Sequence, residues 1–94
     1  MAKLKMFSPF DSKLKVWMNP MFFLHVGQAE RAWTEIVNDG NSLPGKHPAD
    51  FVLYQIGEFD DDTGMVNPIS PPVQVITSTA CLRKPEGVLP LERQ

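Results

Sequence analysis

One segment, QAERAWTEIVND at residues 28–39, determines which class of fold this chain can adopt. Its apolar residues recur at i, i+3, i+4, i+7 and i+8, so a helix would carry them as one stripe formed by Ala29, Ala32, Trp33, Ile36 and Val37. Gly27 can cap the start of this helix, and Gly40 suits the left-handed residue that ends many helices. We therefore predict one amphipathic helix from about Gln28 to Asp39, with Trp33 facing a sheet.

Strand-forming patterns precede the helix. Residues 2–7 and 12–18 alternate apolar and polar side chains, and the Ser-Pro-Phe-Asp segment between them, residues 8–11, has the chemistry of a turn. These features predict a β-hairpin. Residues 21–24 are apolar and form either a further strand or a buried connection.

Further strand patterns follow the helix. After a loop at residues 41–50, the apolar run at residues 51–59 predicts a strand at the centre of the sheet. An acidic turn at residues 60–64 leads to a short edge strand at residues 65–69. Residues 73–82 are rich in β-branched side chains and are expected to close the sheet.

The order of these elements predicts an α+β fold. We expect a small antiparallel sheet of four to five short strands, with one amphipathic helix packed on one face. Residues 1–82 should form a single compact domain, and residues 83–94 an extended C-terminal tail. A symmetric homodimer is also expected, because a sheet with a short edge strand and a small core gains by pairing with itself.

Charge is distributed unevenly along the chain, whose net charge is −2. Residues 1–24 carry four lysines and one aspartate, a balance of +3, whereas residues 25–94 have a balance of −5. Such asymmetry can mark an anion-binding surface, although it also arises from a chance distribution of solvated charge.

The predicted hairpin would gather basic and aromatic side chains on one face. Because side chains alternate along a strand, the shared face would carry Lys3, Lys5, Phe7, Lys13, Lys15 and Trp17. Single-stranded nucleic acid is bound by positive grooves with aromatic rings on which bases stack. These residues are therefore the expected site for single-stranded DNA, bound without strong sequence preference. In the other interpretation, the two aromatic residues belong to the core and the lysines keep an edge hairpin soluble.

Several short segments allow a comparison with known families: KLKMF at 3–7, DSK at 11–13, PMFF at 20–23, RAW at 31–33, VND at 37–39, KHPAD at 46–50 and GEFDDDTG at 57–64. These segments resemble the small non-structural proteins of gokushovirus-type microviruses, which are single-stranded-DNA phages. The last two are the most specific. The resemblance implies a phage protein made in the cytoplasm of the infected bacterial host, acting in viral DNA synthesis or packaging. No catalytic residue set comes with it.

Other chemistries have less support in the sequence. Cys81 is the single cysteine, and neither His25 nor His47 lies at a ligand spacing from another metal-binding side chain, so no metal or cofactor is expected. The chain has no nucleophile elbow and no phosphate-binding glycine loop, so we do not expect an enzyme. No apolar run approaches the ~20 residues needed to cross a bilayer, so no membrane partner is expected.

A different functional class also fits the sequence. The chain could be a protein-interaction adaptor or scaffold for the viral replication or capsid machinery. It would use an exposed apolar surface around Met18, Met21, Phe22 and Phe23, since methionine-rich aromatic surfaces adapt well to partners. The same residues could instead fill the core, which is the commoner location of such side chains.

Overall fold

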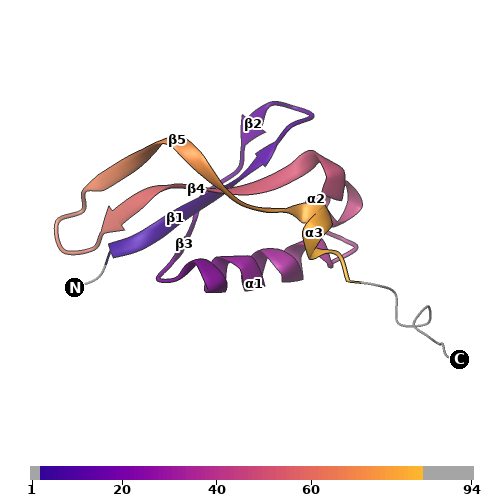
Figure 1. Cartoon of the computed structure of the whole chain (residues 1–94), viewed down its shortest axis with the longest axis horizontal. Helices are drawn as coiled ribbons and strands as arrows, with labels where there is room; N and C mark the ends of the chain where they lie inside the picture. The colour runs from indigo at the N-terminus through magenta and orange to yellow at the C-terminus, as the bar shows by residue number, and fades with distance from the viewer. Residues whose placement is uncertain (1–2, 84–94) are drawn as a thin grey trace, which may run out of the picture.

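Two long central strands organise this protein, whose computed structural model describes residues 3–83 (Figure 1). The elements in chain order are β1 (Lys3–Asp11), β2 (Val16–Trp17), β3 (Met21–Phe23), α1 (Val26–Val37), α2 (Leu43–Lys46), the 3-10 turn η1 (Pro48–Asp50), β4 (Phe51–Asp60), β5 (Val66–Thr77) and α3 (Ser78–Cys81). Of the predicted C-terminal tail, residues 84–94 lie outside the described residues.

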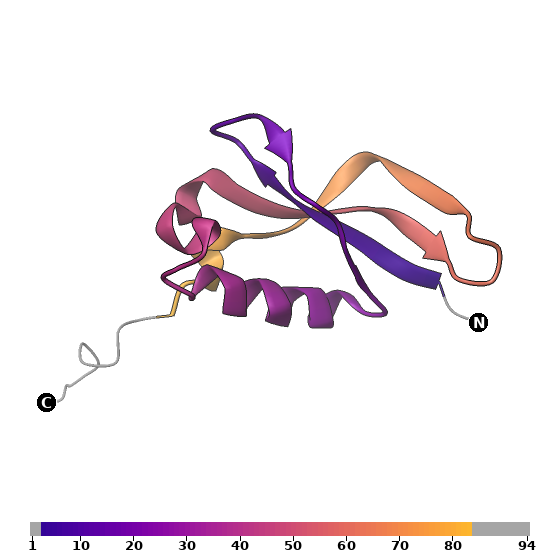
Figure 2. The same ribbon diagram turned by 180° about the vertical axis from the view of Figure 1, so that it is seen from behind.

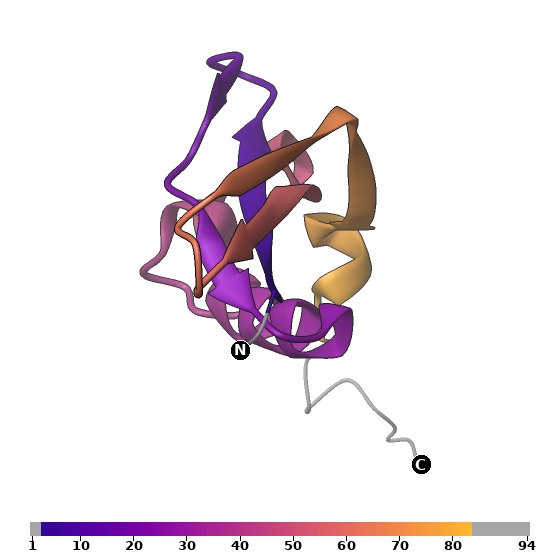
Figure 3. The same cartoon turned by 90° about the vertical axis from the view of Figure 1, so that its left-hand side faces the viewer.

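The strands form one antiparallel sheet in the order β2-β1-β4-β5, with β3 also paired to β1. Figure 3 shows α1 and α3 on one side of this sheet and the β1–β2 turn reaching away from them. The predicted α+β class, an antiparallel sheet of four to five strands with one amphipathic helix packed on one face, is confirmed, and the sheet has five strands. The predicted central strand is also confirmed, since β4 lies between β1 and β5.

The core lies between α1 and the sheet. Its buried apolar side chains are Phe7, Ala29, Trp33, Val37, Phe51, Leu53 and Cys81. Trp33 is only 1% exposed, and its indole Nε1–H donates a hydrogen bond to the buried Ser78 hydroxyl at 3.0 Å. A buried indole N–H without a partner would cost free energy, so this bond fixes α3 against α1.

The predicted hairpin is wrong in its turn. Residues 8–11 continue β1 instead of reversing the chain, and the turn lies at residues 12–15. Asp11 makes this turn, because its Oδ1 accepts from the backbone N–H groups of Lys13 and Leu14 at 2.9 and 3.2 Å. The pairing of β1 with β4, from Lys3 opposite Asp60 to Asp11 opposite Phe51, outweighs the local turn chemistry.

The second half of the predicted sheet is also corrected. Residues 65–69 and 73–82 are not two strands, because β5 runs unbroken from Val66 to Thr77. As an edge strand β5 tolerates three prolines, and its register with β4 shifts between Gln55 and Gly57. Residues 78–81 are the helix α3, capped by the Thr77 hydroxyl, which accepts from Ala80 N–H at 3.3 Å.

Smaller corrections concern the connections. The predicted loop at residues 41–50 contains α2 and η1, and the Ser42 hydroxyl caps α2 by accepting from Gly45 N–H at 2.9 Å. Residues 21–23 form the strand β3. Helix α1 starts at Val26, because Gln28 Oε1 accepts from the His25 N–H at 3.1 Å and so caps it there.

Replacement of Trp33 by alanine should lower the free energy of unfolding by about 3–5 kcal/mol, because it empties the largest volume in the core and leaves Ser78 without its donor. Urea denaturation followed by circular dichroism measures this change. The matched variant Trp17→Ala removes the same side chain from a site that is 46% exposed, and should cost clearly less. Equal losses in the two variants would contradict the assignment of Trp33 to the core.

Two glycine-to-alanine variants should have opposite effects on stability. A methyl group on Gly57 would lie 2.7 Å from the backbone oxygen of Asn67 and 3.2 Å from Pro68 Cα, so β5 would have to move. Gly57→Ala should therefore cost about 1–3 kcal/mol. Gly27→Ala meets nothing within 4 Å and should stabilise α1 by about 0.5–1 kcal/mol. Thermal unfolding of both variants, measured side by side, checks the sign of each change.

Candidate nucleic-acid interface

The structure separates the six residues that the sequence predicts as DNA contacts. Lys13 and Lys15 lie in the exposed turn after β1, and Trp17 follows them in β2. Lys3 and Lys5 lie at the other end of β1, where Lys5 is separated from the turn by roughly 20 Å at about 3.3 Å per residue. The four lysines therefore do not share one patch.

Phe7 has a different role from the predicted one. Its side chain is fully buried, and its ring lies 6.1 Å from that of Phe23. It supports the core and offers no surface on which a base can stack. Because side chains alternate along a strand, Lys3, Lys5 and Phe7 lie on the same side of β1. Lys3 is directly opposite Asp60 of β4, and Lys5 is directly opposite Glu58. These opposite acids reduce the positive potential that the two lysines can present.

The structure brings together a group of aromatic rings that sequence reasoning missed. Phe10, Trp17 and Tyr54 come from three adjacent strands, and we call them the aromatic platform. The ring centroids of Phe10 and Trp17 are 4.7 Å apart, those of Trp17 and Tyr54 5.1 Å, and those of Phe10 and Tyr54 6.5 Å. The Trp17 ring contacts both neighbours, yet this residue remains 46% exposed.

Strand alternation places the aromatic platform on the face of the sheet that α1 leaves open. In β4, Phe51 and Leu53 are buried in the core beneath α1, so Tyr54 points to the opposite face. In β1, Phe10 is likewise on the opposite face from Phe7. Phe10 is directly opposite Trp17 in the register, which brings the third ring to the same face.

Backbone and hydroxyl contacts hold β2 beside β1. The Ser8 hydroxyl donates to the Met18 carbonyl oxygen at 2.7 Å, and Met18 N–H donates to the Pro9 carbonyl oxygen at 2.8 Å. On the other side of the turn, the N–H and the hydroxyl of Ser12 both donate to the Asp50 carbonyl oxygen, at 2.8 and 3.0 Å. The short strand β2 and its tryptophan are thus fixed at both ends.

A second apolar group occupies the far half of the same face. Phe22 and Phe59 pack edge to face with centroids 5.9 Å apart, and Phe22 is 44% exposed. We call these two residues, together with the exposed Val66, the distal apolar surface. Of the residues predicted for an adaptor surface, Met21 and Phe23 instead pack against the core, whereas Met18 and Phe22 are exposed.

The acidic segment at residues 60–62 leads from β4 into the turn before β5, and Figure 2 shows this turn at the opposite end of the sheet from the β1–β2 turn. The carboxylates of Asp60, Asp61 and Asp62 offer ligand atoms within 4.8 Å of one another in the β4–β5 turn. Exposed acidic turns of this kind commonly occur without an ion. In this turn Gly64 adopts φ 77°, the left-handed conformation that glycine tolerates best.

The sequence did not predict Phe10 and Tyr54 as residues of the platform, and the physical reason differs between them. Phe10 lies in the segment whose Ser, Pro and Asp residues predicted a turn, so it was not placed on a strand face. Tyr54 lies in the apolar run at residues 51–59, which predicts a central strand but does not indicate which of its side chains are exposed. The geometry of a strand offered one signal. Because successive side chains point to opposite faces, Tyr54 lies on the face opposite Phe51 and Leu53.

Comparisons with known proteins identify one match. A protein-family model described as "Phage ORF5 protein" matches residues 4–81 of this chain. Neither the curated proteins nor the solved structures contain a match. In residues 3–83, none of the helices has the length and apolar character needed to span a membrane.

Proposed function

Because this chain belongs to the phage ORF5 protein family, we propose that it is a phage non-structural protein that binds single-stranded DNA without strong sequence preference. Its role would be in viral DNA synthesis or packaging, in the cytoplasm of the infected bacterial host. The KHPAD and GEFDDDTG segments, at residues 46–50 and 57–64, support a gokushovirus-type microvirus as the source. The proposal is for a binding protein, with no catalytic step.

The aromatic platform is the observation that carries this proposal. A half-exposed Trp17 ring, in contact with the rings of Phe10 and Tyr54, would present a supported surface on which any base can stack. Each base stacked on an aromatic side chain contributes about 1–3 kcal/mol. Because every base has such a face, binding by stacking has little sequence preference.

The geometry also revises which lysines take part. Lys13 and Lys15 lie in the turn that leads into Trp17, so they can contact the phosphates of a strand stacked on the platform. Lys3 and Lys5 lie at the far end of β1 beside acidic residues and are left out of the proposed interface. The proposed contacts are Phe10, Lys13, Lys15, Trp17 and Tyr54.

Fluorescence anisotropy with a labelled oligo-dT tests the proposal. Trp17→Ala should weaken binding by about 1–3 kcal/mol without changing its salt dependence. The double variant Lys13→Gln/Lys15→Gln should flatten the slope of log affinity against log salt by roughly 1.4, at about 0.7 per lost phosphate contact. Circular dichroism of each variant verifies that it is folded.

The matched control is the double variant Lys3→Gln/Lys5→Gln, which removes the same charge at the other end of β1. It should leave the slope nearly unchanged. Equal flattening by the two double variants would show that only net charge matters, and would remove the platform from the interface. Absence of binding by the folded wild type at low salt would overturn the proposed function.

The distal apolar surface favours a second candidate function, a protein-interaction adaptor. Phe22 and Val66 are 44% and 53% exposed, and such an apolar surface suits a viral replication or capsid protein or a second copy of this chain. Association through it would persist at high salt, whereas phosphate contacts weaken steeply. Light scattering at high salt therefore separates the two candidates.

A further inference from the structure

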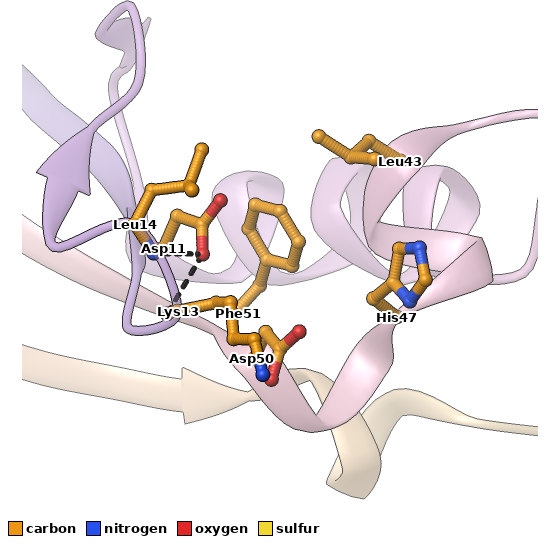
Figure 4. Close-up of a pocket in the computed structure, with 7 residues that line it drawn as sticks. All are labelled: Asp11, Lys13, Leu14, Leu43, His47, Asp50 and Phe51. Atoms are coloured by element: carbon orange, nitrogen blue, oxygen red, sulfur yellow. Dashed lines mark hydrogen bonds between the residues drawn. The ribbon is translucent and has the colours of Figure 1, made fainter.

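A cavity of about 390 Å³ opens between the β1–β2 turn and the segment that contains α2 and η1 (Figure 4). Its apolar walls are formed by Leu14 from the turn, Leu43 from α2 and Phe51 from β4. Cavities of this volume accept ligands the size of one nucleotide. Neither the aromatic platform nor the distal apolar surface includes these walls.

Hydrogen bonds fix the two sides of the cavity relative to each other. The two Ser12 bonds to the Asp50 carbonyl oxygen join the turn to η1. Asp11 is directly opposite Phe51 in the register of β1 and β4, which holds the floor of the cavity in the sheet. The cavity is therefore formed in advance of any ligand.

One oxygen of the Asp11 carboxylate, Oδ2, has no hydrogen-bond donor from the described residues at this cavity. Asp11 is only 5% exposed, and its Oδ1 accepts both backbone bonds of the turn. Among the hydrogen bonds within residues 3–83, none involves Oδ2, and Figure 4 shows the second oxygen pointing toward the space between Leu14 and Phe51. Because Oδ2 faces the cavity and has no protein donor, it can accept a hydrogen bond from a ligand N–H.

The polar groups of the cavity match the two ends of a nucleotide. Asp11 and Asp50 provide carboxylate acceptors for the amino group of a base, and the Lys13 ammonium provides a cation for its phosphate. The apolar walls suit the base ring. We propose that this cavity binds one amino-bearing nucleobase, cytosine, adenine or guanine, of the single strand. This inference rests on the proposed function and adds a base preference to it.

The positions of the two sites determine the path of the bound single-stranded DNA. Asp11 is the neighbour of Phe10 in β1, and their side chains point to opposite faces of the sheet. The aromatic platform and the cavity thus lie at the same end of the sheet but on opposite faces. The turn with Lys13 and Lys15 connects the two sites, so single-stranded DNA that crosses this turn reaches both.

Anisotropy with oligo-dC and oligo-dT of equal length measures the base preference. Wild type should bind oligo-dC roughly tenfold more tightly, because the cytosine amino group offers two N–H donors to the carboxylates and thymine only its N3–H, a difference of one hydrogen bond to a charged acceptor. Asp11→Asn keeps the Oδ1 acceptor of the turn but replaces Oδ2 by an amide donor, so it should erase this preference. Leu43→Trp, at a residue that is 49% exposed, should fill the cavity and erase it too.

Nuclear magnetic resonance with dCMP and dTMP tests nucleotide binding in the cavity separately from stacking on the platform. The methyl signals of Leu14 and Leu43 should shift with dCMP and much less with dTMP. If Asp11→Asn fails to fold, Leu43→Trp still tests the base preference in the anisotropy measurement.

The possible outcomes are distinct. Equal, Trp17-dependent binding of oligo-dC and oligo-dT would overturn the cavity proposal and leave the proposed function intact. Leucine shifts with dCMP alone, without any binding of oligo-dT, would support the cavity and contradict the platform. Tighter binding of an arginine-rich peptide than of dCMP at these leucines would assign the cavity to a basic protein side chain and overturn the proposal.

Discussion

The pairing of β1 with β4 is the constraint on which the other features depend. It extends over the whole of β1 and contains one register shift, between Met6 and Phe7. Side-chain alternation in the two paired strands then sorts residues between the faces. Phe7, Phe51 and Leu53 are directed to the core, whereas Phe10 and Tyr54 face away from it. One pairing thus produces both the core and the candidate interface.

The register shift has its own consequence for the surface. Because a one-residue slip moves side chains to the other face, the residues of β4 beyond the shift exchange sides. Phe59 then lies beside Leu4 on the face that Phe10 also occupies, and it contacts Phe22 of β3. Without the shift this ring would point to the opposite face. The bulge therefore accounts for aromatic side chains at both ends of one face.

The sequence predicted the elements whose signals were local and periodic, and it failed where long-range pairing decided the outcome. Helix α1 follows from the apolar stripe around Trp33, and β4 from a continuous apolar run. The turn at residues 8–11 was a reasonable local expectation, but its residues pair with β4. A turn at these residues would place all four lysines on one face and leave Phe10 outside the strands. Residues distant in sequence, such as Tyr54 and Trp17, met only through the register of three strands.

The proposed function requires a chain with a net charge of −2 to approach a polyanion, and the position of the charges is compatible with this. Asp60 ends β4, and Asp61 and Asp62 begin the β4–β5 turn. This turn and the β1–β2 turn, which contains Lys13 and Lys15, lie at opposite ends of the sheet (Figure 2). At physiological salt, interactions between exposed charges fade beyond about 8 Å, so the acidic turn has little effect on phosphates at the β1–β2 turn. Its repulsion would act instead on DNA that approaches the acidic end of the sheet. In the proposed interface, local charge at the platform, and not the net charge of the chain, would therefore determine where single-stranded DNA binds.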